Sequence, residues 1–352
     1  MRKTLILLHR WIALAVSLVL LLTAASGSIL VFEGAIDRGR HPELWRIEPG
    51  AATLPIDTIV ARVEAKFPDA KIAAVSIAPV PDRAWTMGVG AANAYVNPYT
   101  GAVNGTRSRA MEQASFPRRV HVFHVEFFAG PYGRTFVAII TAIALFLVLT
   151  GIILWWPDKL IRVSTTASWK RINFDLHHAL GIFAALVLVV ITSSAMLIHF
   201  DGLASAVKSL DAIPAPPPPV QAAGPADAPR PSFDALAASA RGALPGANIM
   251  SVSAGGAKSP AVVAMRFPED HTPGGRSRVF IDHFNGAVLA VVNTRTAGLG
   301  TKIDNLKRSL HTGDVMGKPT EAIWLLATLV LLSQVVTGVL MWWNARKGRA
   351  RA

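Results

Sequence analysis

Four long apolar stretches constrain this chain more than any other feature of its sequence. None of them contains an Asp, Glu, Lys or Arg, and each is 22 residues long. A helix rises about 1.5 Å per residue, so such a stretch is just long enough to cross roughly 30 Å of hydrocarbon. The sequence therefore predicts a membrane α-helical protein with four spanning helices, at residues 11–32, 135–156, 179–200 and 322–343.

The basic residues set the expected orientation. Lys and Arg are frequent in the short segments that flank the stretches, residues 1–10, 157–178 and 344–352. Short basic flanks stay in the cytoplasm, so we expect both termini there and two long segments, 33–134 and 201–321, on the far side. Much of the net charge of +13 then reflects topology, and no nucleic-acid partner is needed to explain it.

Composition narrows the chemistry further. Hydrophobic residues make up 52% of the chain and charged residues only 16%, against about a quarter in soluble proteins. There is no cysteine, so disulfides, iron–sulfur clusters and thiolate catalysis within the chain are excluded. A redox cofactor would need other ligands.

Two halves of the chain, 1–160 and 170–352, look like copies of one another. "TGIILWWP" begins at Thr150 and "TGVLMWWN" at Thr337, and a histidine precedes each threonine by 26 residues. The Trp pairs suit an interfacial aromatic belt, and the Thr-Gly pairs allow close helix approach. We therefore expect parallel repeats around an axis along the membrane normal.

The far-side segments repeat a second pattern. Each reads as an amphipathic helix followed by strand-like runs, which end in "VNPYTGAV" at 96–103 and "IDHFNGAV" at 281–288. These two runs have the strand–turn–strand composition of a hairpin. We therefore predict two small α+β units. A Pro-rich stretch at 212–231 has no counterpart and is expected to be an extended linker.

The sequence resembles the PepSY-associated transmembrane proteins. The resemblance rests on the "NPYTGAV" hairpin and on helices ending in "TG-x-x-LWWP", and it covers nearly the whole chain. It implies two PepSY-like units on the periplasmic side of a bacterial inner membrane. Some members of the group are iron-regulated membrane proteins or ferric-siderophore reductases with b-type haem. The resemblance therefore implies an iron-uptake enzyme that reduces a ferric siderophore.

Histidines recur at both ends of the predicted helices. Aligning Thr23 with Thr192 superposes one pair near the cytoplasm, and the 26-residue spacing relates a second pair on the far side. Neutral imidazoles suit iron, and ligation by two histidines favours electron transfer over oxygen binding. We therefore predict two haem b groups within a four-helix bundle. The candidate axial ligands are His9 with His178, and His124 with His311.

The far-side histidines need a break in the chain to reach the bundle. A straight helix would carry His124 about 16 Å above Thr135. Because "GPYG" at 130–133 and "GKP" at 317–319 interrupt a helix, we expect each to fold its histidine back over the bundle.

Other histidines leave alternatives open. His177 competes with His178, and His199, at the other end of the same helix, competes with His311 or bonds a haem propionate. His121 lies three residues before His124 and suits a supporting role. The outer-segment histidines are expected to be solvated; they are His41, His271 and His283.

Partners follow from what the sequence lacks. It contains no nucleotide-binding glycine loop and no hydrolase motif, so a quinol or a membrane or cytoplasmic protein must donate electrons. Four basic residues near the mouth of the bundle would attract an anionic chelate; they are Arg118, Arg119, Lys307 and Arg308. The alternative function is a non-enzymatic, membrane-anchored PepSY regulator or scaffold of a periplasmic partner, in which these histidines are interfacial residues.

Overall fold

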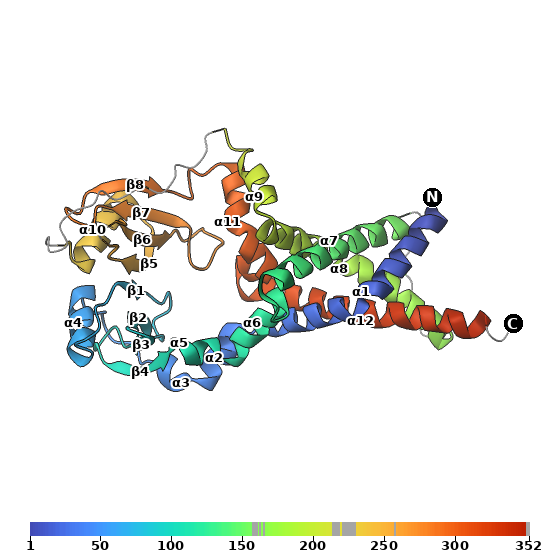
Figure 1. The fold of residues 1–352 in the computed structure, drawn as a ribbon, viewed down its shortest axis with the longest axis horizontal. Coiled ribbons are helices and arrows are strands. Elements are labelled where there is room, and N and C mark those ends of the chain that lie inside the picture. Colours follow the sequence, from blue (N-terminus) through green and yellow to red (C-terminus); the bar gives the residue numbers. More distant parts are fainter. Residues whose placement is uncertain are drawn as a thin grey trace. The chain divides into compact units, whose positions relative to one another are not determined.

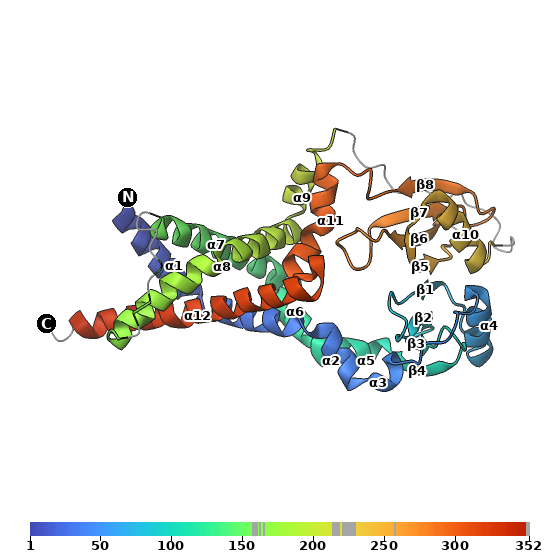
Figure 2. The same ribbon diagram turned by 180° about the vertical axis from the view of Figure 1, so that it is seen from behind.

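The computed structural model describes residues 1–349 except 157–160, 162, 165, 213–218, 220–229 and 257. Most of the expected Pro-rich linker and part of the 157–178 loop therefore lie outside the described residues. The chain divides into two compact units (Figures 1 and 2). The helical unit comprises Met1–Glu33, Phe116–Val207 and Leu306–Ala352, and the sheet unit comprises Gly34–Ser115 and Lys208–Asn305.

Within the described residues, four helices are long and apolar enough to cross a membrane. They are α1 (Arg2–Leu30), α7 (Gly130–Trp155), α8 (Trp169–His199) and α12 (Lys318–Arg349). They confirm the four predicted spans, although each helix extends past its charge-free stretch at one end or both. The protein is therefore a multi-pass membrane protein.

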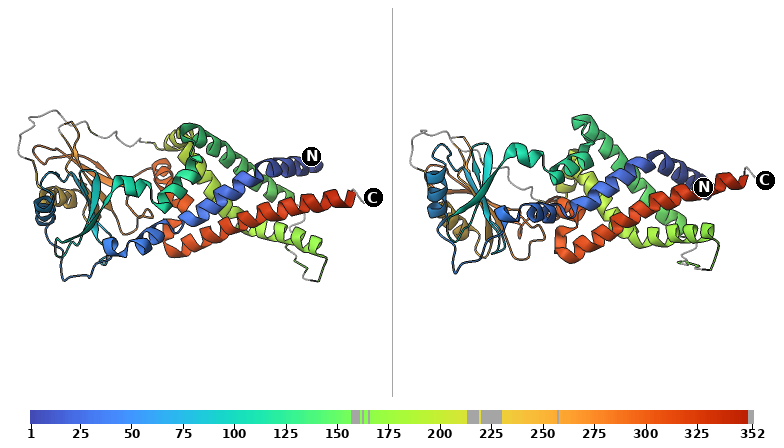
Figure 3. Two further views of the ribbon diagram at one scale, coloured as in Figure 1. Left: turned by 60° about the horizontal axis from the view of Figure 1, so that its bottom comes forward. Right: turned by 90° about the horizontal axis from the view of Figure 1, so that it is seen from below.

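The four helices form a bundle in which α1 and α8 each pack against α7 and α12 (Figure 3). One apolar cluster joins α1 to α7, through side chains such as Leu20 and Ile140. A second cluster joins α8 to α12, through Leu188 and Ala327. Small and aliphatic side chains thus let the helices approach closely in the middle of the bundle.

Shorter helices precede the two return helices of the bundle, and two of them carry histidines. α6 (Phe116–Glu126) comes before α7, whereas α11 (Leu299–Thr312) and the short helix η1 (Asp314–Met316) come before α12. The chain must reverse direction sharply between α6 and α7, because α6 packs against both α1 and α7. His124 lies on α6, and His311 lies on α11.

The sheet unit contains one antiparallel sheet, for which the described residues give eight strands in the order β4-β3-β2-β1-β5-β6-β7-β8 (Figure 1). The first four strands are β1 (Ala74–Ser76), β2 (Trp85–Val89), β3 (Ala92–Val96) and β4 (Val103–Ser108). The other four are β5 (Asn248–Ser253), β6 (Ala261–Arg266), β7 (Ser277–Ile281) and β8 (Val288–Val292).

The segments between α1 and α7 and between α8 and α12 thus share one sheet rather than forming the two separate small units that the sequence suggested. β1 pairs with β5 through residues such as Val75, which lies opposite Val252. Two separate four-stranded sheets would each leave one of these strands as an unpaired edge, and pairing them removes both edges. The helices α4 (Ile56–Lys66) and α10 (Phe233–Ala243) cover one face and share a continuous apolar core with the strands.

Asp57 and Asp234 hold α4 and α10 together at their N-termini. The Asp234 carboxylate accepts hydrogen bonds from the backbone N–H groups of Ile56 and Asp57, both at 3.0 Å. The Asp57 carboxylate accepts from the N–H groups of Phe233 and Asp234, at 2.8 and 3.1 Å. Each carboxylate therefore satisfies donors that the other helix leaves open.

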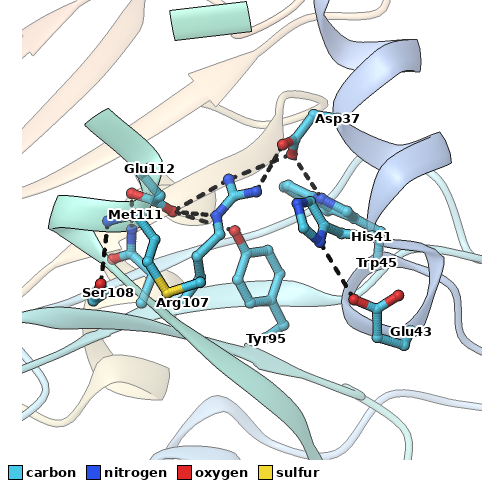
Figure 4. A network of polar contacts seen from close by, with 10 residues as sticks. Asp37, His41, Glu43, Trp45, Tyr95, Arg107, Ser108, Met111 and Glu112 are labelled. Carbon is cyan, nitrogen blue, oxygen red and sulfur yellow. Dashed lines mark hydrogen bonds and ion pairs between the residues drawn. The ribbon is translucent and has the colours of Figure 1, made fainter. Parts of the chain in front are cut away.

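A polar network fastens short helices to the β4 edge of the sheet (Figure 4). Arg107 of β4 bonds Asp37 of α2 (Glu33–Arg40) at 2.7 Å, and Trp45 of α3 (Pro42–Trp45) donates to the same carboxylate at 2.9 Å. Glu112 of α5 (Arg109–Gln113) accepts from the Tyr95 hydroxyl at 3.2 Å. The remaining helix of the described residues is α9 (Asp201–Lys208).

Candidate metal-ligating histidines

His124 and His311 come together in the helical unit. Their ring centroids are 6.1 Å apart and their planes are inclined by 43°. Both residues are half-buried. The structure therefore brings together the two histidines that the 26-residue spacing relates, although they lie on different short helices.

The Nδ1 atoms of both rings bond to backbone carbonyls of the bundle. His124 Nδ1 lies 3.1 Å from Thr23 O and 3.0 Å from Ser26 Oγ, and His311 Nδ1 lies 3.1 Å from Ile191 O. A carbonyl only accepts hydrogen bonds, so Nδ1 carries the proton and Nε2 keeps its lone pair. This is the arrangement in which a second group orients an imidazole for metal binding through Nε2.

Close packing leaves His124 little freedom. A Cβ atom on Gly27 would lie 3.1 Å from the His124 Cε1 atom, so the ring occupies space that a side chain would fill. Burial, followed by the proximity of His311, lowers the pKa of His124 to about 3. Burial also lowers the pKa of His311. Both rings are therefore neutral near pH 7, the form that binds a metal.

The chain reverses before each return helix, but the expectation that "GPYG" interrupts the first one is wrong, because these residues form the first turn of α7. After α6 the backbone turns at Phe127 and Phe128, whose φ angles of 47° and 60° are unusual for bulky residues. α7 already begins at Gly130, so the break precedes "GPYG". In the second half the turn lies between Gly313 and Gly317, just before Lys318.

Glycine is required inside the first reversal. A Cβ atom on Gly133 would lie 1.8 Å from the carbonyl oxygen of Glu126, so only glycine fits where the chain passes itself. In the second reversal, Gly313 has a φ of 81°, and Trp324 Nε1 donates to Leu310 O at 2.7 Å. The two turns thus use different contacts, and both place a histidine, His124 or His311, against the bundle.

At the other end of the bundle, two histidines make the same contact. His9 Nδ1 lies 2.8 Å from Thr150 Oγ1, and His177 Nδ1 lies 2.8 Å from Thr337 Oγ1. The glycine after each threonine packs against the ring, because Cβ atoms there would lie in ordinary van der Waals contact with the Cε1 atoms, at 3.7 and 3.5 Å. The repeated Thr-Gly pair is therefore a seat for an imidazole, a role that the sequence argument missed.

The structure corrects the alignment that superposed His9 on His178. From His9 to Thr23, which bonds His124, is 14 residues, and from His177 to Ile191, which bonds His311, is also 14. Contacts at both ends of α1 and α8 thus relate His9 to His177. His178 points elsewhere and stacks on Phe174, with ring centroids 4.2 Å apart. Both residues remain within electrostatic reach of His9.

The other candidate residues surround the outer pair. His199 lies within electrostatic reach of both His124 and His311. His121 Nδ1 lies 3.2 Å from an Arg118 guanidinium nitrogen. Burial lowers the pKa of His121. Arg119 and Arg308 are exposed, whereas the side chains of Arg118 and Lys307 are half-buried.

One of the histidines expected to be solvated is instead buried. His283 is only 1% exposed, and its Nδ1 lies 2.6 Å from Ala254 O. The hairpin that carries it folds inward, so the residue is part of the core. His41 is half-buried near Glu43, and His271 is exposed.

The donor set fits an iron porphyrin better than a bare ion. In the described part of the chain, no three His, Asp or Glu side chains converge to hold a metal. Each histidine pair therefore offers two nitrogens, and a porphyrin supplies the other four ligands of iron. Metal–imidazole bonds are about 2.0–2.1 Å long, so two rings on opposite sides of one ion have centroids roughly 6 Å apart. The spacing of His124 and His311 agrees with this value.

The fold and these contacts define a four-helix membrane protein with paired imidazoles between its helices. The chain belongs to the family described as the PepSY-associated TM region, which matches residues 6–345. The suspected resemblance is thus confirmed over almost the whole sequence. No curated protein matches the chain.

Proposed function

We propose that this protein is a haem b protein of the bacterial inner membrane that passes electrons across the bilayer. One haem would be held by His124 and His311, and a second by His9 and His177. The proposal rests chiefly on the 6.1 Å separation of the His124 and His311 rings. We further propose that the chain arose by duplication, that its termini are cytoplasmic and that the sheet unit is periplasmic.

The supporting contacts suit electron transfer. Threonine hydroxyls and backbone carbonyls hold each Nδ1, which fixes the ring and raises the basicity of Nε2. Ligation of a haem by two of these histidines would favour electron transfer over oxygen binding. When bound, a haem supplies reversible one-electron chemistry. The two levels of histidines lie about 21 Å apart along α1, because His9 and Thr23 are 14 residues apart.

We propose a ferric siderophore as the electron acceptor. One electron converts the chelated ferric ion to ferrous iron, which hard oxygen ligands bind less tightly, so the metal is released. Arg119 and Arg308 are exposed on α6 and α11 and would attract an anionic chelate. Arg118 and Lys307 would add to this field. A quinol, or a membrane or cytoplasmic protein, would supply the electron.

An absorption spectrum of the purified full-length protein tests the proposal. We expect a Soret band and sharp reduced α-bands that correspond to two haems. His124→Ala and His311→Ala should each remove one haem, and His9→Ala and His177→Ala should each remove the other. His178→Ala should retain both, which separates the two adjacent histidines. His271→Ala, at an exposed position, is the control.

A contrary result has a clear meaning. If the protein is colourless after iron-replete expression, or if the four substitutions leave the spectrum unchanged, the haem proposal is wrong. A membrane-anchored PepSY regulator or scaffold would then be the better hypothesis. If haem is present but a ferric chelate does not reoxidise the reduced protein, only the choice of acceptor is wrong.

A further inference from the structure

The sheet unit contains a cavity of about 910 Å³ that plays no part in the proposed electron transfer. It lies where α4 begins and where β5 and β6 approach the end of α10. Both far-side segments contribute to its wall. Binding sites for small molecules commonly have volumes of about 300–1,000 Å³, so this cavity is large enough for a ligand.

One side of the cavity is apolar. Trp85 is 7% exposed and forms part of the wall together with Ile77 and Met250. The lining thus combines aliphatic side chains with an aromatic ring, which is a common composition for a site that holds the body of an organic ligand.

The other side carries two arginines that have no carboxylate partner among the described residues. Arg241 is exposed on the last turn of α10, and no hydrogen bond or ion pair to it is found in the described part of the chain. Arg266 is half-buried and donates to a neutral carbonyl, Asp270 O, at 3.1 Å. Its Nε atom is buried without an acceptor among those residues.

Among the described residues, no ion pair joins the acid in the cavity wall to either arginine. The Asp234 carboxylate already accepts two backbone hydrogen bonds, from Ile56 and Asp57. The Asp270 carboxylate is likewise engaged, by the N–H of Phe267 and the hydroxyl of Thr294. A buried donor without a partner is costly, and a guanidinium bonds best to a carboxylate.

From these contacts we propose that the cavity binds a small organic anion, a carboxylate attached to an apolar or aromatic body. Arg241 and Arg266 contact the carboxylate, and Trp85 packs against the body. This would give the sheet unit a ligand-binding function of its own. It does not depend on haem or on the identity of the electron acceptor.

Isothermal titration of the full-length protein in detergent tests this proposal. The probe is naphthalene-2-carboxylate, and the neutral comparison is 2-naphthylmethanol, which has the same ring system. We expect saturable binding of the carboxylate and at least about tenfold weaker binding of the alcohol. Arg241→Gln and Arg266→Gln should each weaken carboxylate binding by about tenfold or more. Arg109→Gln, at an exposed position on α5, should leave it unchanged.

Three outcomes would overturn the proposal. The carboxylate could show no saturable binding, the alcohol could bind as tightly as the carboxylate, or Arg241→Gln and Arg266→Gln could bind the carboxylate as tightly as the Arg109→Gln control does. Loss of binding in Arg266→Gln counts only if its unfolding midpoint equals that of the parent protein. Arg241 is exposed, so its substitution provides the test without that condition. The haem spectrum should be unchanged in every variant, which keeps this test separate from that of electron transfer.

Discussion

The His177 imidazole and the Thr337 hydroxyl lie 2.8 Å apart, and this contact determines which ring nitrogen carries the proton. Thr337 Oγ1 donates its own hydrogen to Ser333 O, at 2.6 Å, one turn earlier in α12. While the hydroxyl donates to Ser333 O, its oxygen accepts from His177 Nδ1. Thr150 repeats the arrangement, since its hydroxyl donates to Phe146 O at 2.8 Å and accepts from His9. Nε2 is thus left unprotonated in both rings.

Removing either hydroxyl should weaken cofactor binding at the end of the bundle that carries His9 and His177. Thr150→Val and Thr337→Val keep the shape of the side chain but leave the imidazole without an orienting acceptor, so we expect about 10–100-fold lower haem affinity. Haem retention during dilution, followed by absorbance, measures the effect. Thr141→Val is a matched control on α7, because among the described residues the Thr141 hydroxyl bonds only Val137 O of its own helix, at 2.8 Å. An equal effect in this control would contradict the assigned role.

Gly133→Ala should disrupt the outer histidine pair. The new Cβ would overlap the Glu126 carbonyl oxygen, so the reversal between α6 and α7 must open and move His124 away from α1. We expect a loss of about 1–3 kcal/mol in stability and loss of the outer haem only. Differential scanning calorimetry and the reduced spectrum measure the two effects. Gly202→Ala, where a Cβ would meet no described atom within 4 Å, should change neither.

The reciprocal caps should make the sheet unit sensitive to acid. Burial acts to raise the pKa of Asp57, but hydrogen bonds from Ser232, Asp234 and Phe233 outweigh it and lower the pKa below 3.8. The carboxylate therefore contributes its full stability above the unfolded-state pKa of about 3.8, and this contribution is lost as the pH falls through the lower folded-state pKa.

Substitution should reproduce the effect of acid at neutral pH. Asp57→Ala leaves the N–H groups of Phe233 and Asp234 without their acceptor and should cost about 0.5–2 kcal/mol, measured by denaturant unfolding. In this variant the loss of stability as the pH falls below about 3.8 should become shallower. Asp69→Ala, at an exposed position, should leave the pH profile as it is. Identical profiles for the two variants would exclude the capping role.

The Arg107–Asp37 ion pair should contribute more to the free energy of unfolding than the exposed ion pair between Arg295 and Glu269. Asp37→Asn removes the charge that Arg107, only 11% exposed, requires as a partner. We expect a cost of about 1–3 kcal/mol, less than that of a fully buried pair because Asp37 retains some solvent contact. Glu269→Gln breaks the exposed pair with Arg295 and should give no measurable change in the unfolding midpoint. Equal effects would show that burial adds nothing to the network.

Many residues of the candidate site could be predicted from the sequence, and the predictions that failed can be traced to individual residues. The 26-residue spacing singled out His124 and His311, and the structure places their rings 6.1 Å apart. The Thr-Gly motif was recognised, but its function as an imidazole seat was not. A hydroxyl contact between segments 141 residues apart leaves no local pattern.

The sequence by itself determined the four spanning helices, since a charge-free run of 22 residues has no better solution than to cross the bilayer. Only the tertiary structure decided that His177, and not His178, corresponds to His9. Adjacent residues on a helix point about 100° apart, so His177 and His178 face different neighbours. An alignment of α1 with α8 by sequence can be shifted by one position with little change in the match, because both segments consist mostly of small and aliphatic residues. The joining of β1 to β5 and the burial of His283 also depended on distant parts of the chain. The physical reason is the same in each case. The hydrophobicity of a residue is a local property that can be read from the sequence, whereas the contacts of its side chain depend on residues that folding brings close to it.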